Sequence, residues 1–170
     1  MRKSIIVYYS WYGNTEVVAT ELNRQTQYPM EKLEEVNKRK PKTYVKATIE
    51  AVFGYRTKLK PFQMDMHQYG HIFLGTQVWA NHFSPAVKSF IKKVDLKHKK
   101  VYMFITKADD SVPESALRRM RRRIKRKGGQ LMDVMILKTK WTPSQFDLIK
   151  FEDVKDKIRN WIEKNQLSTL

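Results

Sequence analysis

The feature that most constrains the fold is a short apolar segment that leads directly into a polar turn and then a helix. Residues 5–9 read Ile-Ile-Val-Tyr-Tyr without a polar break. A continuous apolar run of this length is typical of a strand buried on both faces, so we expect a strand over Lys3–Tyr9. The turn Ser10–Thr15 follows, and residues 16–22 have helical composition. A buried strand that feeds a helix through a tight turn is the opening of a β-α-β unit.

The same alternation continues along the chain. Further strands are predicted over His71–Gly75, Lys100–Thr106 and Leu131–Leu137, and an edge strand over Met30–Val36. Apolar residues at helical spacing predict helices over Thr43–Phe53, Ser84–Val94, Ser111 to about Lys127, and Phe151–Ile162. This alternation indicates an α/β fold in which a mostly parallel sheet carries helices on both faces. The chain shows no repeat, low-complexity segment or linker, so residues 1–170 are expected to form one domain.

Local signals predict several helix ends. Ser84 before Pro85 is typical of an N-cap followed by the first helical residue. The sequence Ser111-Val112-Pro113-Glu114 matches a capping box, in which the serine and the glutamate each satisfy a free backbone donor. Gly128 and Gly129 predict the end of the same helix.

Composition excludes several classes of chemistry. The chain has no cysteine, so disulfides, thiolate zinc sites, iron–sulfur clusters and cysteine nucleophiles are excluded. Its four histidines lack the paired spacing of metal ligands, and we assign neither a metal site nor a catalytic residue. No apolar run is long enough to span a bilayer and none resembles a signal peptide, so we expect a cytoplasmic protein without a membrane partner.

Ligands of an open parallel sheet bind outside the carboxyl ends of its strands, where the strand order reverses. The turns after the first three buried strands along the chain therefore hold the candidate binding residues. These turns read Ser10-Trp11-Tyr12-Gly13-Asn14-Thr15, then Thr76-Gln77-Val78-Trp79-Ala80-Asn81, then Thr106-Lys107-Ala108-Asp109-Asp110.

The first of these turns has the groups that bind a phosphate. Ser10 and Thr15 supply hydroxyl donors, Asn14 supplies an amide, and Gly13 lets the backbone turn so that its N–H groups converge. The predicted helix that begins near Thr15 points its positive end at the same place. Neither the P-loop pattern nor the triple-glycine dinucleotide pattern is present. A compact turn rich in hydroxyl groups suits a terminal monophosphate better than a pyrophosphate.

Two of these turns resemble those of the flavodoxin family. Ser10–Thr15 is similar to the family's phosphate loop, which has the pattern Ser/Thr-x-Thr/Tyr-Gly-Asn-Thr directly after the first strand. Gly75–Ala80 reads Gly-Thr-Gln-Val-Trp-Ala and is similar to the second flavin loop, commonly Gly-Thr-Pro-x-Trp-Ala/Gly. The segment that begins Ser84-Pro85 also resembles the helix that follows that loop. The resemblance is clearest over 4–22 and 69–106.

The resemblance implies a three-layer fold with a five-stranded parallel sheet of order 2-1-3-4-5 and a non-covalently bound FMN. Ser10, Tyr12, Gly13, Asn14 and Thr15 would hold the FMN phosphate, and Trp11 would either lie in the site or cover the sheet edge. The isoalloxazine ring would lie between the second and third turns, whose candidate residues are Thr76, Gln77, Val78, Trp79, Ala80, Asn81, Thr106, Lys107, Ala108 and Asp109. The absence of a long insertion in the last strand resembles the short-chain branch of the family.

The sequence departs from the family pattern at three points. Gln77 replaces the usual proline, and the third turn lacks the glycine that is common there and carries Lys107 with Asp109 and Asp110. The net charge is +17, from 34 Lys and Arg against 17 Asp and Glu, whereas typical flavodoxins are acidic. A basic protein favours anionic partners, so we expect an acidic redox partner protein or, as a second choice, nucleic acid.

The predicted helix that precedes Gly128 concentrates this charge. Leu117–Lys127 contains eight basic side chains around a narrow apolar seam of Leu117, Met120 and Ile124. Two interpretations stay open: a solvated amphipathic helix, or a docking surface for an acidic protein or nucleic acid.

Three functions follow from these observations. The first is an FMN-binding electron-transfer protein, in which the cofactor does the electron chemistry. The second is an NAD(P)H-dependent FMN or quinone reductase, although the sequence has no identifiable nicotinamide motif. The third is a non-enzymatic module of the same fold that binds nucleic acid or acidic partners through its basic face.

Overall fold

The computed structural model describes residues 3–37, 49, 56–79, 82–108, 111–142 and 145–167. Five parallel strands form its central sheet: β1 (Lys3–Tyr8), β2 (Met30–Lys32), β3 (Tyr69–Trp79), β5 (Lys100–Lys107) and β6 (Gln130–Lys138). Their order is β2-β1-β3-β5-β6, which confirms the predicted order 2-1-3-4-5. A sixth strand, β4 (His82–Phe83), pairs antiparallel with the end of β3 and was not predicted.

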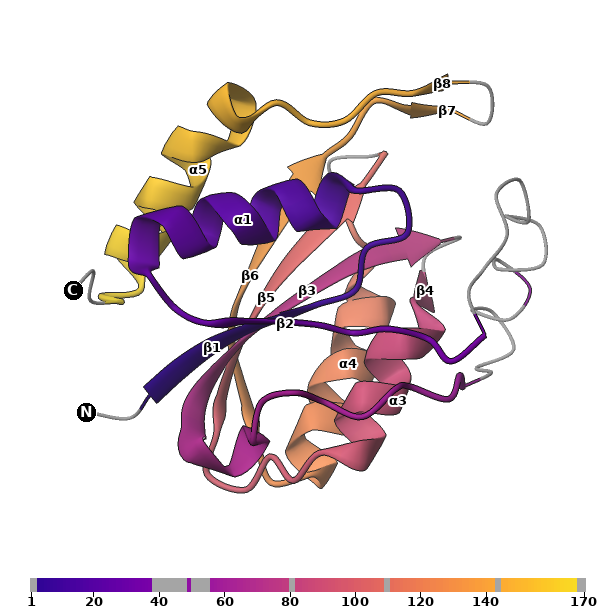
Figure 1. Cartoon of the computed structure of the whole chain (residues 1–170), viewed down its shortest axis with the longest axis vertical. Helices are drawn as coiled ribbons and strands as arrows, with labels where there is room; N and C mark the ends of the chain where they lie inside the picture. The colour runs from indigo at the N-terminus through magenta and orange to yellow at the C-terminus, as the bar shows by residue number, and fades with distance from the viewer. Residues whose placement is uncertain are drawn as a thin grey trace.

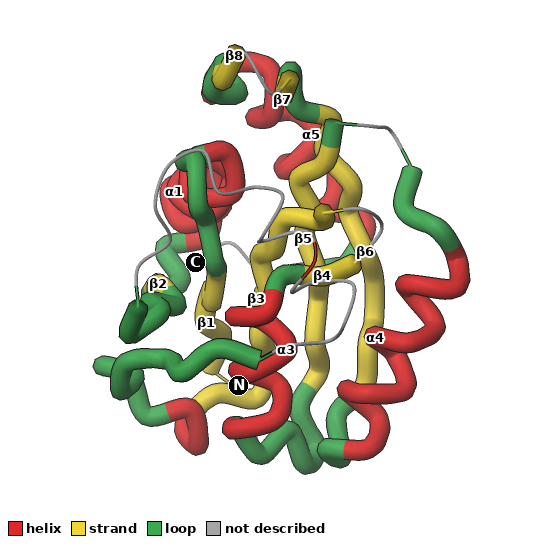
Figure 2. The backbone as a smooth tube through the Cα atoms, turned by 90° about the vertical axis from the view of Figure 1, so that its right-hand side faces the viewer, coloured by secondary structure: helices red, strands yellow, loops and turns green. Residues whose placement is uncertain are grey.

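Helices cover both faces of the sheet, as Figure 1 shows. Helices α1 (Asn14–Thr26) and α5 (Phe151–Lys164) lie on one face, and α3 (Pro85–Lys93) and α4 (Glu114–Arg126) lie on the other. Figure 2 looks onto the second face, with α3 and α4 toward the viewer. A short 3-10 turn, η1 (Met66–Gln68), precedes β3, and a hairpin of β7 (Trp141–Thr142) and β8 (Gln145–Phe146) precedes α5. The predicted three-layer fold is confirmed.

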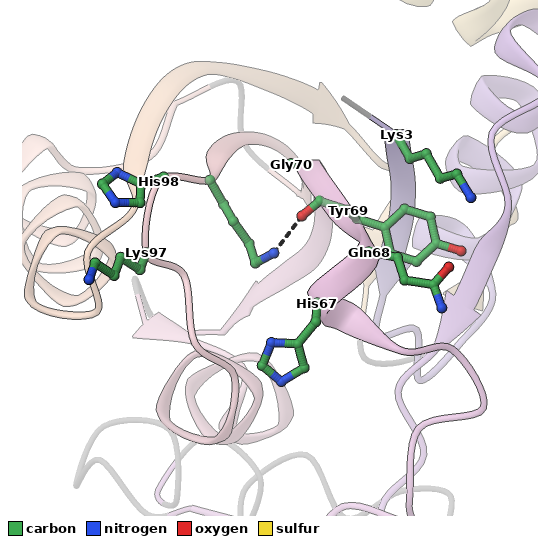
Figure 3. Close-up of a pocket in the computed structure, with 8 residues that line it drawn as sticks. Lys3, His67, Gln68, Tyr69, Gly70, Lys97 and His98 are labelled. Atoms are coloured by element: carbon green, nitrogen blue, oxygen red, sulfur yellow. Dashed lines mark hydrogen bonds between the residues drawn. The ribbon is translucent and has the colours of Figure 1, made fainter. Parts of the chain in front are cut away.

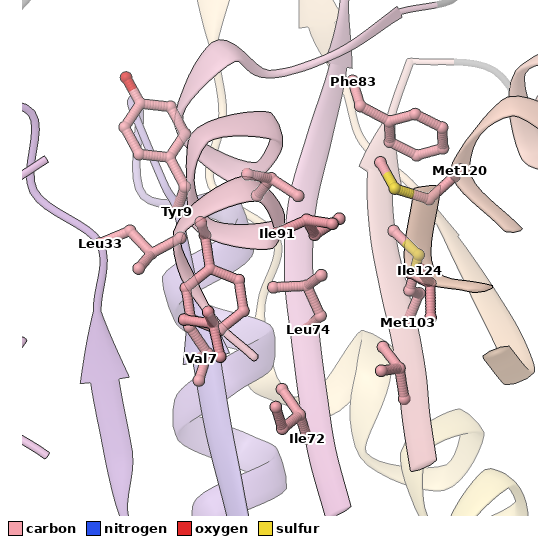
Figure 4. Packing of buried hydrophobic residues seen from close by; sticks show 14 of the residues in the cluster. Val7, Tyr9, Leu33, Ile72, Leu74, Phe83, Ile91, Met103, Met120 and Ile124 are labelled. Carbon is pink, nitrogen blue, oxygen red and sulfur yellow. The ribbon is translucent and has the colours of Figure 1, made fainter. Parts of the chain in front are cut away.

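The alternation of side chains along the strands builds one hydrophobic cluster on each face. Ile72 and Leu74 of β3 pack with Ile91 of α3 in the first cluster, which also contains Met103 and Ile124 (Figure 4). Phe73, between the first two in sequence, points the other way and packs with α1 and α5. Both faces of β3 are therefore buried at its centre, which explains why Ile72-Phe73-Leu74 is apolar without a break.

Two predictions about helix ends have opposite outcomes. Ser84 is the N-cap of α3, where its hydroxyl oxygen accepts from the Val87 N–H at 3.4 Å, and Pro85 is the first helical residue. The capping box at Ser111 is wrong, because α4 begins at Glu114 with Pro113 in the N-cap position. A residue before proline is pushed toward extended backbone, so Val112 cannot begin the helix that a cap at Ser111 requires.

The second predicted turn is also corrected, because β3 continues through Trp79. Gln77 pairs with Thr106 of β5, and Val78 pairs with Phe83 of β4. These pairings extend the strand beyond Gly75, where the sequence predicted its end. The predicted helix at Thr43–Phe53 lies outside the described residues, apart from Ile49. Among the helices that the structure describes, none is both long and apolar enough to cross a bilayer.

The C-terminal helix is fixed to the sheet edge by a single carboxylate. Asp133 of β6 accepts three hydrogen bonds on its Oδ2 atom, each 2.9 Å long, from the Trp161 indole N–H, the Lys164 ammonium and the Asn165 amide. Burial alone would raise the pKa of Asp133, but the bonds from Asn165 and Lys164 hold it below its ordinary value. Asp133 is therefore ionised near neutral pH and orders the end of α5.

Candidate functional site

The carboxyl ends of β1, β3 and β5 meet at one edge of the sheet, and hydrogen bonds join the segments that follow them. The Trp11 N–H after β1 donates to the Gln77 side-chain oxygen on β3 at 3.2 Å. The hydroxyl groups of Thr15, at the start of α1, and Thr106, at the end of β5, lie 2.8 Å apart. The structure therefore brings together all three segments that the sequence selected.

The turn after β1 has a backbone conformation that lets a ligand come close to the main chain. Gly13 has φ +96°, a left-handed conformation that favours glycine, and its N–H donates to the Ser10 hydroxyl oxygen at 3.1 Å. Because Ser10 accepts this bond, its own O–H can donate to a ligand. Helix α1 begins at the next residue, so its first N–H groups, which have no intrahelical acceptor, are at the same turn. A helix N-terminus of this kind favours an anion.

Charges near this turn are paired in part. Glu16, in the first turn of α1, forms an ion pair with Lys32 at 2.8 Å and accepts from the Tyr8 hydroxyl at 3.1 Å. Burial, and then the Glu16 carboxylate, raise the pKa of Tyr8, so this phenol stays protonated. The lysine compensates the acidic residue that would otherwise oppose an anion at the helix N-terminus.

Three predicted ligand residues form side-chain hydrogen bonds within the protein. The hydroxyls of Thr15 and Thr106 are buried and bonded to each other, so only one proton of the pair is left for another acceptor. The Asn14 side-chain oxygen accepts from the Ile149 N–H at 2.8 Å. Asn14 and Thr15 therefore shape the turn, and their predicted contact with a phosphate stays untested.

The side chains of the second segment, residues 76–81, point alternately to the two faces of the sheet where it belongs to β3. Some of them therefore lie in the core and others in the candidate site. Thr76 is fully buried, with its hydroxyl 3.3 Å from that of Ser84, and Val78 packs in the hydrophobic cluster under α3 and α4. Gln77 lies on the opposite face, that of α1. Its side-chain nitrogen is buried and has no hydrogen-bond partner within the described structure. An unpaired buried amide donor is costly, so a ligand that accepts from it would stabilise this site.

Fewer contacts are described for the remaining predicted site residues. Trp11 is half-buried, and its ring centroid is 4.5 Å from that of Tyr12. The Lys107 ammonium donates to the Ser111 carbonyl oxygen at 2.9 Å. Trp79 ends β3, whereas Ala80, Asn81 and Asp109 lie outside the described residues.

Sequence reasoning missed a fourth segment, the one that precedes α5. Besides the bond from Ile149 to Asn14, the Leu148 side chain lies against Gly13, where a Cβ atom would come within 2.8 Å of Leu148 Cδ2. No local pattern marks these residues, because the contact joins positions about 135 residues apart. Gly13 is therefore constrained twice, by its φ angle and by this close approach.

A separate cavity of about 440 Å³ lies at the opposite edge of the sheet, near the amino ends of β1, β3 and β5 (Figure 3). Basic residues dominate its lining, among them Lys3, His67, Lys97 and His98. The Lys99 ammonium there donates to the Tyr69 carbonyl oxygen at 2.5 Å, the dashed line in the figure. None of the predicted site residues lines this cavity. Within the described part of the chain, no group of three His, Asp or Glu side chains is arranged to hold a metal.

Comparison with solved structures identifies the fold. A provisionally assigned flavoprotein from Bacteroides eggerthii DSM 20697 is 16% identical, with a TM-score of 0.78 over 99% of this chain and 100% of that chain. Oxidised flavodoxin 1 from Bacillus cereus is 17% identical, with a TM-score of 0.53 over 98% of this chain and 99% of that chain. The chain has a flavodoxin-like fold.

A third structure with this fold contains a ligand. It is a flavoprotein from Lactobacillus acidophilus NCFM in complex with FMN, 19% identical, with a TM-score of 0.64 over 80% of this chain and 93% of that chain. No protein-family model matches the chain, and neither does any curated protein. The flavodoxin resemblance inferred from the two loop motifs is thus supported by structure, at identities too low for sequence comparison to detect.

The hydroxyl pair at the junction of α1 and β5 gives a testable expectation. Replacing Thr106 with valine leaves the buried Thr15 hydroxyl without its partner, so the free energy of unfolding should fall by about 1–3 kcal/mol. The double variant Thr15→Val/Thr106→Val removes both polar groups and should regain part of this loss. Urea denaturation followed by tryptophan fluorescence measures both. Additive losses would show that the two hydroxyls do not stabilise the junction as a pair.

Proposed function

We propose that this protein binds FMN non-covalently at the carboxyl edge of its sheet and acts as an electron-transfer protein. The observation that carries the proposal is the connection of the three predicted segments at one edge, by the bonds from Trp11 to Gln77 and between Thr15 and Thr106. The flavodoxin-like fold, and the FMN bound to the Lactobacillus acidophilus protein with the same fold, support it.

The residues present fit a singly phosphorylated flavin. The Ser10 hydroxyl and the first N–H groups of α1 form a donor set for one phosphate, at the turn that Gly13 makes. The amide nitrogen of Gln77, which has no partner among the residues that the structure describes, suits a heterocycle with hydrogen-bond acceptors, as an isoalloxazine ring has. Lys107 and Ala108 would border the ring on the β5 side, and Trp79, Ala80, Asn81 and Asp109 stay predicted contacts.

Bound FMN would supply one- and two-electron transfer, and the protein would set its orientation, solvent access and electrostatics. The absence of a nicotinamide motif favours a carrier over a stand-alone reductase. The basic surface favours an acidic redox partner, and we keep a cytoplasmic location as part of the proposal.

FMN retention tests the binding. Protein incubated with FMN and then desalted should keep a flavin absorbance spectrum near one equivalent, and loss of the spectrum would contradict the proposal. The variant Gly13→Ala should bind FMN about 5- to 30-fold more weakly, because a left-handed alanine costs roughly 1–2 kcal/mol. Titration of flavin fluorescence measures the Kd. Gly129→Ala, at a glycine with ordinary φ, is the matched control and should leave the Kd unchanged.

A kinetic measurement separates the carrier from a reductase. The FMN-loaded protein should oxidise NADH or NADPH slowly when a quinone is the acceptor, and turnover should rise when a flavodoxin reductase is added. Rapid turnover by the protein alone would replace electron transfer with a reductase function and leave FMN binding intact.

A further inference from the structure

Helix α4 carries charge of almost one sign. Its 13 residues include seven arginines and lysines and a single acid, Glu114. Helix α5 differs, because its 14 residues include four basic and four acidic side chains, and Arg159 pairs with Asp156 at 3.4 Å. Both helices bury one apolar side against the sheet and expose the other side to water. Contact with water therefore does not by itself require the single sign of α4.

The cations of α4 are placed by the geometry of the helix. Its buried residues are Ala116, Met120 and Ile124, which recur at every fourth position. Arg118 and Arg122 lie midway between them in sequence, so with 3.6 residues per turn they project from the opposite side, and both are exposed. Side chains four residues apart on a helix are neighbours. Arg118 and Arg122 thus form the centre of a line of positive charge.

Contacts among the described residues do not account for this line of charge. The ion pair that they give to an arginine of α4 joins Arg121 to Glu114 at 3.9 Å, and both side chains are more than half exposed. Like charges four residues apart destabilise a helix. The helix dipole favours cations only in the last turn, whose first basic residue is Arg123, so it does not favour Arg118 or Arg122. An acidic surface laid on α4 would replace this repulsion with attraction.

Helix α4 begins beside the candidate site. β5 ends at Lys107, whose ammonium donates to the Ser111 carbonyl oxygen at 2.9 Å, and α4 begins three residues later at Glu114. From there α4 runs toward the opposite edge of the sheet, where β6 begins (Figure 2). A weak electron-transfer interface covers up to about 600 Å² per partner, a patch roughly 25–30 Å across, whereas α4 is only about 20 Å long. A protein seated over Arg118 and Arg122 therefore reaches the carboxyl edge of the sheet.

We propose that the exposed face of α4 docks an acidic one-electron carrier protein, whose carboxylates pair with Arg118 and Arg122. This docking rests on the proposed electron-transfer function, because it brings the carrier beside the FMN site. The reduced carrier gives one electron to the bound flavin and is itself oxidised by one electron. Complementary charge speeds the encounter, and salt weakens it by screening. Helix α4 has no aromatic residue on which bases could stack, which favours an acidic protein over a single-stranded nucleic acid.

An acidic plant-type ferredoxin is the probe. Fluorescence anisotropy of labelled ferredoxin measures its Kd for the flavin-free protein, and stopped-flow absorbance measures the second-order rate constant at which reduced ferredoxin reduces the FMN-loaded protein. The double variant Arg118→Gln/Arg122→Gln should raise the Kd and lower the rate constant, each at least about 5-fold at low salt. It should also make both quantities less dependent on salt, because two of the attracting charges are gone.

The matched control, Lys155→Gln/Lys157→Gln, removes the same charge from exposed positions of α5 on the opposite face of the sheet. It should change the Kd and the rate constant less than about 2-fold, because these side chains lie outside the docked surface. Glutamine has a helix propensity close to those of arginine and lysine, so both variants should keep their helices. Circular dichroism checks that they do.

Three results would overturn the proposal. Absence of ferredoxin binding at low salt would remove the docking itself, and equal weakening by the two double variants would show that net charge determines binding. A 20-nucleotide oligothymidylate that bound more tightly than ferredoxin at about 0.15 M salt, and lost affinity only in the α4 variant, would assign this face to nucleic acid. A protein that failed to retain FMN would give no rate constant, whereas the Kd of the flavin-free protein would still test the docking.

Discussion

Replacing Gly75 with alanine is expected to lower the free energy of unfolding by about 1–3 kcal/mol. A Cβ atom at this position of β3 would lie 2.3 Å from Phe104 Cζ and 2.8 Å from Tyr8 Cβ. Phe104 and Tyr8 are buried on the two neighbouring strands, directly beside Gly75 in the sheet, so neither can move away freely. Urea denaturation measures the loss.

Two further variants show whether the close approach is the cause. Gly129→Ala places its nearest contact at 3.0 Å and should cost less than Gly75→Ala. In a Phe104→Leu background, which removes the ring atoms that approach Gly75, the alanine should be tolerated better than in the unchanged protein. If Gly75→Ala lowered the free energy of unfolding no more than Gly129→Ala does, the close packing described around Gly75 would be contradicted.

The second large effect is expected at Asp133. Its replacement by alanine removes the acceptor of three hydrogen bonds and leaves the Trp161 indole N–H unpaired in a side chain that is 5% exposed. We expect a loss of roughly 2–4 kcal/mol, since bonds to a charged acceptor are stronger than neutral ones. Asp156→Ala, which removes a carboxylate from an exposed pair with Arg159 on the same helix, should cost under about 0.5 kcal/mol.

The contribution of Asp133 to the free energy of unfolding also depends on pH. The pKa of this carboxyl is lower in the folded state than in the unfolded chain, so its stabilisation is present above the unfolded value of about 4. It is lost as the pH falls below that value and through the folded pKa. The difference in unfolding free energy between the unchanged protein and Asp133→Asn should therefore narrow in acid. A difference that stayed constant from pH 7 to about pH 3 would contradict this assignment.

The strands could be predicted from sequence where burial on both faces leaves its own mark. Residues 5–8 and 101–105 are apolar without a break, and they form the centres of β1 and β5. The end of β3 could not be predicted, because Gln77 and Val78 are strand residues only through their pairing with Thr106 and Phe83. Pairing partners distant in sequence leave no local pattern.

The candidate site could be predicted as a set of segments and less well as a set of contacts. The motif at Ser10–Thr15 located the turn with the left-handed glycine. It could not reveal that Asn14 and Thr15 bond to Ile149 and Thr106, because these bonds depend on the tertiary fold. The strand alternation that places Thr76 in the core and Gln77 on the site face was hidden for the same reason: both were assigned to a turn.

The contact of Leu148 and Ile149 with Gly13 and Asn14 links ligand binding at the turn to the stability of the C-terminal helix. Any ligand that holds this turn rigid also holds the start of the segment leading into α5, and the linkage acts in both directions. Loosening α5 should then speed ligand escape, while a filled site should delay fraying of the C-terminal helix. Resistance to proteases at α5 would thus report whether a turn at the other end of the sequence is occupied.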